Sequence, residues 1–513
     1  MTLHSTWFDW LSVQREMDVM PAILSCIFAS AMAIIATLFY RLFLHPLSHL
    51  PGPLPARLTG LWRTTKYIQG NWHDDILSIH NKYGRVVRIA PNEVSVVDEY
   101  AMKNLYGHGH NATKTDWYSI WDPPNTAPQL FSELDKKHHS FLRKRLASAY
   151  SMSSVLKYEV HIQACLDLLI RKLGKYAQAG EIVDMAVWTN AFAFDVVGEL
   201  GYGSQFGHLQ EEKDVGELRK TIFNVFKLLS SVGHLPRWLW LVTSRGAQMI
   251  TGFFNADQPL VAFRNWSAMK VQKRLDNPEM TGREDLLAHF CRMKDLEGKP
   301  ASFLEILVEA MNLVGAGADT TSIGMRTCLY YLATNPEVLA KLREEIDNFY
   351  NINNLKTPIS YLETQKLPYL QAVIKEAIRL LPSIVFQLPR QTPPDFKVRG
   401  IKIPVNTTIG ISPIAQNRDQ EIWGSDANEF RPGRWLENED KTRYFDRSTM
   451  TFGGSGPRMC IGRNIALVEL HKFVAQFVRV FEFKLVNTDT PWRIKAYWFA
   501  YQSEVFMNIS RRK

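Results

Sequence analysis

The longest uninterrupted apolar segment lies near the start of the chain. Residues 21–40, PAILSCIFASAMAIIATLFY, contain no charged side chain. A helix rising about 1.5 Å per residue would span about 30 Å over this length, which matches the hydrocarbon core of a bilayer. Acidic residues outnumber the single Arg15 before the segment, and basic residues follow it, so the positive-inside rule places the rest of the chain in the cytoplasm. A buried core helix and a cleaved signal peptide are the alternatives.

Helical and strand periodicities fill most of the remaining sequence. Apolar positions recur at helical spacing in six long stretches, namely 153–175, 216–231, 303–334, 337–350, 366–381 and 461–481. Residues 83–98 and 397–411 are rich in β-branched side chains, and Pro91-Asn92-Glu93 interrupts the first of them, which predicts a β-hairpin. The pattern therefore predicts one large, mainly α domain with a small β-region.

These patterns divide the chain into four segments. We expect a lumenal segment at 1–20, a transmembrane anchor at 21–40, a hinge at 41–55 and a single domain at 56–513. The hinge is predicted because HPLSHLPGPLP, residues 45–55, holds too many prolines to continue a helix.

Composition narrows the class of protein. The 513 residues are 46% hydrophobic and 22% charged, which excludes long disorder, and the net charge of +9 suits an acidic protein partner or an anionic membrane. The sequence has no dense Lys/Arg run, so nucleic acid is the least favoured partner. The five cysteines are scattered without a C-x-x-C pair, which argues against a disulfide framework or a four-cysteine zinc site.

One cysteine lies in a loop unlike the surroundings of the other four. The stretch TFGGSGPRMCIGR places Cys460 among glycines, close to Arg458 and directly before the predicted helix 461–481. Glycines let a backbone approach a flat ligand, and a helix N-terminus with a nearby cation favours thiolate over thiol. Such a thiolate is a nucleophile or a metal ligand; the loop has no histidine to act as a base, and haem iron can bind a lone thiolate. A structural turn with a buried cysteine is the alternative.

A charged pair stands out in the apolar stretch LQAVIKEAIRLLP. Glu376 and Arg379 are three residues apart and so share one helix face, where we expect them to be buried and paired. Arg434, in FRPGRW, is a candidate third member of this group.

The predicted helix 303–334 carries GAGADTT in its middle. Two glycines inside a helix cost about 1 kcal/mol each relative to alanine. We interpret them as opening a groove for a small ligand, next to Asp319 and Thr320, whose side chains can deliver protons. A packing notch for a neighbouring helix is the alternative.

Together these motifs resemble the cytochrome P450 superfamily of haem-thiolate monooxygenases, over nearly all of the chain after the anchor. The Cys460 loop is similar to the haem-binding signature, Glu376 and Arg379 to the E-x-x-R pair, and residues 316–321 to the oxygen-activation motif. The resemblance implies a mainly α fold with a small β-region, in which a single P450-type haem domain at 56–513 follows the transmembrane helix.

The resemblance also implies roles for single residues. Cys460 would be the axial ligand of the iron of haem b, and Asp319 and Thr320 would help to protonate dioxygen. Glu376, Arg379 and Arg434 would be structural. The other residues implied in cofactor binding are Arg458, Arg390, and His139 with Arg143 at the spacing of the family's Trp-x-x-x-Arg.

Three positions depart from the family pattern. The family's phenylalanine lies seven residues before the cysteine, where this chain has Gly453, and Phe452 lies eight before it, as though the loop held one extra residue. His139 replaces a tryptophan, and Gly433 replaces a glutamate. None of these changes removes a group that the chemistry requires.

The resemblance implies a monooxygenase anchored in the endoplasmic reticulum membrane with its catalytic domain in the cytoplasm. It would insert one oxygen atom of O2 into an apolar small molecule, as similar enzymes of filamentous-fungal secondary metabolism do. Electrons would come from an NADPH-dependent flavoprotein reductase, with cytochrome b5 as a second candidate donor, and a basic patch would steer the partner: Lys136, Lys137, Lys144 and Arg145. A haem-thiolate isomerase or dehydratase and a non-catalytic haem-binding protein are the alternatives.

The candidate walls of the substrate pocket are largely apolar and partly aromatic, which favours a substrate of the same kind. They are Trp117, Trp121, Leu313, Ile384, Phe386, Trp498 and Phe499. Ordinary core positions are the alternative for each of them.

Overall fold

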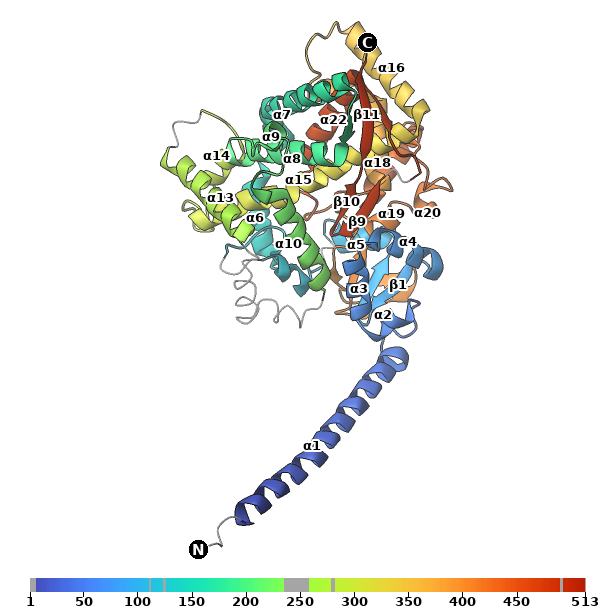
Figure 1. Cartoon of the computed structure of the whole chain (residues 1–513). Helices are drawn as coiled ribbons and strands as arrows, with labels where there is room; N and C mark the ends of the chain where they lie inside the picture. Colours follow the sequence, from blue (N-terminus) through green and yellow to red (C-terminus); the bar gives the residue numbers. More distant parts are fainter. Residues whose placement is uncertain are drawn as a thin grey trace.

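A computed structural model describes residues 6–109, 112–122, 126–234, 258–277, 282–489 and 492–512. A long N-terminal helix leads into a body built mainly of helices, with small sheets (Figure 1). This confirms the predicted fold class. The longer helices are α1 (Thr6–Phe39), α3 (Leu61–Gln69), α4 (Trp72–Tyr83), α5 (Glu99–Tyr106), α6 (Lys136–Ala147), α7 (Met152–Ala179), α8 (Met185–Tyr202), α10 (Leu218–Val232), α13 (Gln258–Asp276), α15 (Phe303–Thr334), α16 (Pro336–Ile352), α18 (Pro368–Leu380), α21 (Glu439–Ser448) and α22 (Arg463–Val480).

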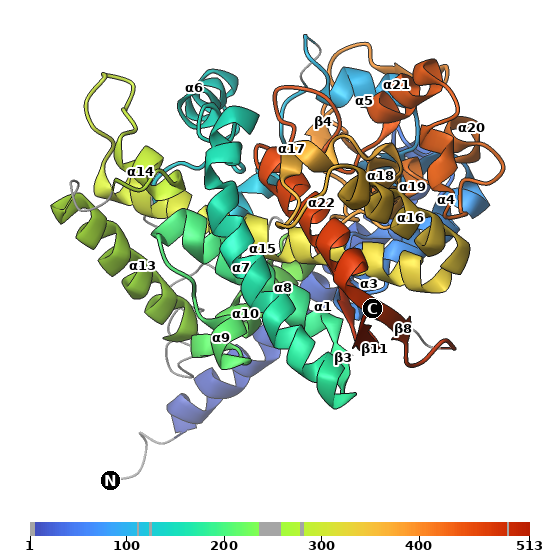
Figure 2. The same cartoon turned by 90° about the horizontal axis from the view of Figure 1, so that it is seen from above.

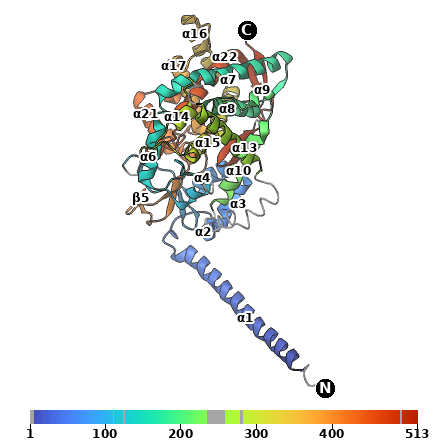
Figure 3. The ribbon, with the colours of Figure 1, turned by 90° about the vertical axis from the view of Figure 1, so that its left-hand side faces the viewer.

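Helix α1 extends away from the body in both side views (Figures 1 and 3). Residues Met20–Leu44 form a candidate membrane span with a mean hydropathy of 2.3, and none of it is buried in the body. The predicted anchor at 21–40 falls inside this span. Residues 1–5 of the expected lumenal segment lie outside the described part of the chain.

The segment expected to be a hinge is attached to the body. Leu47 and Leu50 are buried among apolar side chains of the first sheet. The Arg88 amide donates to the Pro51 carbonyl at 2.8 Å, and a Cβ on Gly52 would lie 2.2 Å from the Arg88 carbonyl oxygen. Only glycine fits there, so this part of the predicted hinge at 41–55 is a fixed part of the folded body.

Helix α15 passes through the middle of the body in two perpendicular views (Figures 1 and 2). Its N-terminus is a capping box in which Ser302 and Glu305 satisfy each other's backbone amides, as the sequence predicts. Asn335 ends it, and Pro336 begins α16.

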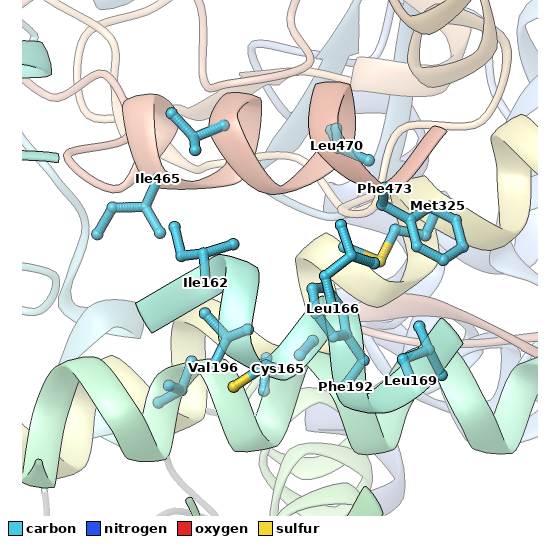
Figure 4. Packing of buried hydrophobic residues seen from close by; sticks show 14 of the residues in the cluster. Ile162, Cys165, Leu166, Leu169, Phe192, Val196, Met325, Ile465, Leu470 and Phe473 are labelled. Atoms are coloured by element: carbon cyan, nitrogen blue, oxygen red, sulfur yellow. The ribbon is translucent and has the colours of Figure 1, made fainter. Parts of the chain in front are cut away.

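Apolar side chains from four helices meet around α15. Figure 4 shows Ile162, Leu166 and Leu169 of α7 beside Phe192 and Val196 of α8, with Met325 of α15 and Ile465, Leu470 and Phe473 of α22. A Cβ on Gly324 would lie 3.1 Å from Leu470, so α15 and α22 pack closely there. Because the Cys460 loop leads directly into α22, this packing brings the loop toward α15.

The sheets are small and lie around the helical core. Strands β1 (Val86–Ala90) and β2 (Glu93–Val96) form the predicted hairpin. They continue through β7 (Thr408–Ile411) to β4 (Arg390–Gln391) in the order β1-β2-β7-β4. Strands β9 (Arg493–Tyr497) and β10 (Phe499–Ser503) form a second hairpin. The remaining strands are β3 (Ile182–Asp184), β5 (Lys397–Val398), β6 (Ile401–Lys402), β8 (Phe481–Leu485) and β11 (Phe506–Arg511).

The short helices complete the fold and connect these elements. They are α2 (Leu54–Leu58), α9 (His208–Glu211), α14 (Leu286–Cys291), α17 (Tyr361–Thr364), α19 (Pro413–Gln416) and α20 (Gln420–Trp423), with the 3₁₀ turns η2 (Asp116–Trp121), η3 (Val215–Glu217) and η5 (Pro432–Trp435) and the π-helical turn η1 (Tyr40–Leu44) that follows α1.

Candidate active site

The loop before α22 is shaped by glycines. Gly453 and Gly454 have φ values of +82° and +76°, in the left-handed region that favours glycine. A Cβ on Gly456 would lie 1.9 Å from the Tyr106 carbonyl oxygen, so this position also excludes a side chain. The Cys460 amide donates to the Phe452 carbonyl at 3.0 Å, and the Phe452 ring lies beneath the guanidinium of Arg463. The extra loop residue is therefore absorbed in the two left-handed glycines.

The Cys460 side chain is exposed, although protein surrounds it on most sides. Burial raises the pKa of its thiol, and the backbone amide of Gly462, the charge of Arg143 and the amide of Arg463 oppose that rise without overcoming it. Helix α22 begins at Arg463 rather than 461. The amides of Gly462 and Arg463 at the helix N-terminus favour the thiolate, as expected, and the cations that add to this effect are Arg143 and Arg463 rather than Arg458.

The middle of α15 has polar and exposed positions inside a buried helix. Ala316 is exposed and Thr320 is half-buried, while Ala318 and Asp319 on either side are buried. Thr320 Oγ1 donates to the Ala316 carbonyl at 2.7 Å, and its own carbonyl accepts from Ser383 Oγ at 2.7 Å. Because Ala316 is exposed and Thr320 is half-buried, this side of α15 is not fully covered by the described side chains; that it admits a small ligand stays a prediction.

A glycine of this helix also allows close packing against a neighbouring helix, which was the alternative interpretation. A Cβ on Gly317 would lie 3.2 Å from Val197 of α8, which makes Gly317 a packing notch between the two helices. The α-helix continues unbroken over Phe303–Thr334. One helix thus packs closely on its α8 side and opens on its Thr320 side.

Asp319 points to a different side of α15 from Thr320. Its carboxylate accepts from Asn190 Nδ2 at 2.8 Å and from the Tyr501 hydroxyl at 3.1 Å. Burial raises the pKa of this carboxyl. The predicted acid and alcohol are adjacent in sequence, but their side chains contact different groups.

A cluster of cations lies close to the Cys460 loop. Arg143 Nη1 donates to the Met459 carbonyl at 2.7 Å, Arg458 Nη1 donates to the Ala112 carbonyl at 3.0 Å, and Arg390 Nη1 donates to the Tyr118 hydroxyl at 2.5 Å. His139 is buried, and burial together with the charges of the surrounding cations lowers its pKa to about 3. The structure therefore brings together the four cofactor-binding candidates other than Cys460.

Lys114 joins this cluster and was missed in the sequence analysis. Its Nζ donates to the carbonyls of Leu130, Phe131 and Glu133. Burial and the charges of Arg458 and Arg390 lower its pKa to about 6. A lone lysine in a loop gives no sequence signal, because its importance comes only from the residues around it in the fold.

Glu376 lies at the centre of a fully buried network. Arg379 donates to both of its carboxylate oxygens at 2.8 Å, Arg434 Nε donates to Oε1 at 2.8 Å, and Trp435 Nε1 donates to Oε2 at 2.9 Å. Burial alone would raise the pKa of Glu376, but the bonds and charges of the two arginines outweigh it, so the pKa is lowered. Arg379 also donates to the Asn417 carbonyl at 2.6 Å, which connects α18 to a distant loop.

The seven pocket candidates occupy two kinds of position. Trp117, Phe386, Trp498 and Phe499 are buried in one largely aromatic cluster, and Leu313 is buried in the main hydrophobic core. Trp121 and Ile384 keep exposed surface and pack against that cluster. The rings of Trp117 and Trp121 both lie near Trp498, with centroids 5.1 and 5.5 Å from it.

One member of the predicted basic patch is not at the surface. Arg145 is largely buried, and its Nη1 donates to Glu305 Oε1 at 2.6 Å. It fixes α6 to the start of α15, so its inclusion in a partner-steering patch was wrong. Lys137 and Lys144 are exposed.

The cytochrome P450 family model matches residues 49–507, which is most of the chain, and the fold and the combination of motifs agree with this match. The chain belongs to the cytochrome P450 family. It is an enzyme of the P450 monooxygenase class, and the family's cofactor is a haem with thiolate ligation. The match begins inside the attached segment that includes Leu50, in agreement with the start of the folded body.

Similar proteins come from filamentous fungi. The chain is 31% identical to cytochrome P450 monooxygenase gsfF of Penicillium aethiopicum, over 93% of this chain and 96% of that protein. It is 30% identical to cytochrome P450 monooxygenase cicH of Emericella nidulans, over 94% and 97%. It is 31% identical to a pisatin demethylase of Fusarium vanettenii, over 90% and 88%.

The residues of this P450 fit a haem. The loop glycines leave no side chain between backbone and ligand, the Cys460 thiol is exposed, and the cation cluster suits the two carboxylates of a haem. Arg390 Nε is buried and has no hydrogen-bond partner among the described residues. An anionic ligand would bond such a donor and offset the mutual repulsion of the cations.

We predict that Glu376→Gln destabilises the protein severely. The change leaves Arg379 buried without a counter-charge and leaves Arg434 with Asp426 alone, and breaking a buried pair in this way costs about 3–5 kcal/mol. Thermal unfolding of detergent-solubilised protein measures the effect. The control is Glu439→Gln in the exposed pair with Arg443, which should leave the unfolding temperature unchanged. Equal unfolding temperatures for both variants would contradict the structural role of Glu376.

Proposed function

We propose that the protein is a membrane-anchored monooxygenase that inserts one oxygen atom of O2 into an apolar, partly aromatic small molecule of fungal secondary metabolism. One observation carries the proposal. The Cys460 loop borders a cation cluster and leads into α22, which packs against α15, where Ala316 is exposed and Thr320 is half-buried. The relatives named as fungal P450 monooxygenases support the secondary-metabolite assignment.

Each group in the site has a separate task. When bound, the haem supplies the activation of O2, and the thiolate of Cys460 donates electron density to its iron. Arg143, Arg390, Arg458 and His139 would hold the haem carboxylates, and Lys114 fixes the loop beside them. The Thr320 hydroxyl and the Asp319 carboxyl hold the protons that the reaction consumes.

Electrons come from an NADPH-dependent flavoprotein reductase, with cytochrome b5 as an additional donor. The exposed lysines of α6, Lys137 and Lys144, are on the helix that also carries Arg143, whose Nη1 bonds the residue before Cys460. An acidic partner attracted to these charges would therefore arrive close to the haem ligand.

We place α1 across the endoplasmic reticulum membrane, with residues 1–20 lumenal and 21–40 as the anchor. The apolar span Met20–Leu44 and the excess of basic residues after it support this orientation. Oxidation of apolar substrates that partition into a membrane suits an enzyme held at its surface.

We predict that membranes containing the protein show a strongly red-shifted Soret band after reduction and binding of carbon monoxide. The band should be absent in Cys460→Ser, because it requires thiolate ligation. Cys291→Ser, a change at a half-buried cysteine outside this site, is the control and should keep the band. A folded, haem-containing wild-type protein without the band would overturn the proposed function.

Thr320→Ala should divert electrons from water or product to hydrogen peroxide. Loss of the hydroxyl removes a proton donor, so the peroxide formed per NADPH should rise several-fold in assays with reductase. The control is Thr334→Ala, since Thr334 makes the same side-chain bond to a carbonyl at the end of α15, at 2.9 Å from Tyr330. An unchanged peroxide ratio would favour an isomerase or dehydratase, which uses no O2, or a proton path that the substrate assists.

Reversing two charges of the basic patch should weaken the response to the reductase. Lys137→Glu with Lys144→Glu is expected to lower the rate of NADPH oxidation most at low salt, because the Debye length is about 10 Å at 0.1 M and screening removes the attraction. Lys213→Glu, an exposed lysine after α9, is the control. A rate that keeps its wild-type salt dependence would exclude this docking surface.

A further inference from the structure

The carboxylate of Asp319 is held by two neutral donors from opposite parts of the chain. Asn190, on α8, donates to Oδ1 at 2.8 Å, and Tyr501, on β10, donates to Oδ2 at 3.1 Å. The side chain is almost fully buried, at 4% exposure. Its position therefore depends on these bonds rather than on contact with water.

The cations near Asp319 are occupied by other groups. Arg326, further along α15, donates to Gln502 at 2.8 Å and to the Ala186 carbonyl at 2.9 Å. Arg219 of α10 pairs with Asp214 at 3.6 Å. Within the described residues, neither arginine forms an ion pair with Asp319, so the two neutral donors alone bond its oxygens.

The ring of Tyr501 is itself fixed by aromatic contacts. It packs edge-on against Phe223 of α10, with centroids 4.8 Å apart, and against Phe499 at 5.8 Å. Phe499 in turn contacts Phe226 of α10 at 4.6 Å. Phe499 belongs to the proposed substrate wall, so Tyr501 presents its ring to that wall and its hydroxyl to Asp319.

We propose that Tyr501 and Asn190 are positioning residues for Asp319, which hold its carboxyl on the α8–β10 side of α15 and so set proton delivery during O2 reduction. This inference rests on the proposed function, because it assumes that Asp319 supplies protons. Neither residue touches the haem site directly. Because the ring of Tyr501 packs against Phe499, a movement of the substrate-pocket wall would also move the Tyr501 hydroxyl that bonds Asp319.

The electrostatics of the carboxyl agree with this geometry. Burial raises the pKa of Asp319, and the bond from Asn190, the charge of Arg326, the bond from Tyr501 and the charge of Arg219 each lower it. These groups come from α8, α15, β10 and α10, the elements that face the carboxyl. Removing the Tyr501 hydroxyl leaves burial less opposed, so the pKa of Asp319 rises further.

The test is Tyr501→Phe in the full-length, haem-containing protein, assayed with reductase, NADPH and O2 alone. Hydrogen peroxide formed per NADPH oxidised is measured from about pH 6 to pH 9. A hydrogen bond to a charged group shifts its titration by about one pH unit, so we expect the profile to move to higher pH by about that much.

The matched control is Tyr497→Phe. Tyr497 lies on β9 of the same hairpin, and its ring contacts the same Phe223, with centroids 5.8 Å apart. It should keep the wild-type pH profile. The carbon monoxide spectrum verifies that each variant is folded and contains haem, and Asn190→Ala provides a second variant that should shift the profile in the same direction if Tyr501→Phe does not fold.

Two further variants, Asp319→Asn and Asp319→Asn combined with Tyr501→Phe, separate this inference from the proposed function. If Asp319→Asn and Thr320→Ala both leave the peroxide ratio unchanged, the proposed role of the pair fails. If Asp319→Asn raises the ratio but Tyr501→Phe and Asn190→Ala keep the wild-type profile, only this inference is overturned. An equal effect of Tyr501→Phe with and without Asp319→Asn would also overturn it, because Tyr501 would then not act through Asp319.

Discussion

The close packing of α15 against α22 is the constraint on which the site depends. Gly324 leaves room for Leu470, and apolar side chains of α7 and α8 surround the contact. In the proposed function each helix carries one half of the chemistry: the Cys460 loop leads into α22, and Thr320 lies on α15. Since protein interiors pack as densely as organic crystals, a shift of one helix would displace the two halves relative to each other. The core is therefore what sets the distance between thiol and hydroxyl.

Buried charged side chains form two different arrangements in the body. Around Glu376, every charged group has partners within the chain, so the network is complete and stabilises the body by itself. Around Arg390, cations gather, and their charges lower the pKa values of Lys114 and His139. The first arrangement belongs to a structural element. The second belongs to a site that is completed by an anionic ligand.

Short motifs made the fold and the centre of the site predictable. The glycine-rich loop, the spacing of Glu376 and Arg379, and the polar residues inside helix 303–334 are local signals that remain visible without a structure. Lys114, Asn190 and Tyr501 could not be found in this way, because their partners are distant in sequence. Arg145 was misplaced for the same reason: its burial depends on where Glu305 lies. The sequence analysis named Arg458 as the cation beside the thiol, whereas Arg143 and Arg463 act on it, because sequence does not reveal which side chains surround the loop.

The attachment of residues 47–52 to the first sheet limits how far the body can move relative to the N-terminal helix. Arg41, at the end of the apolar span, donates to the Leu58 carbonyl at 2.6 Å, and its own carbonyl accepts from Arg88 at 2.8 Å. With α1 across a bilayer as proposed, the body would be joined to its anchor by a short, bonded connection rather than by a flexible tether. Its surface would then keep one tilt toward the lipid, and its encounters with a membrane-bound reductase would become a search in two dimensions between pre-oriented molecules.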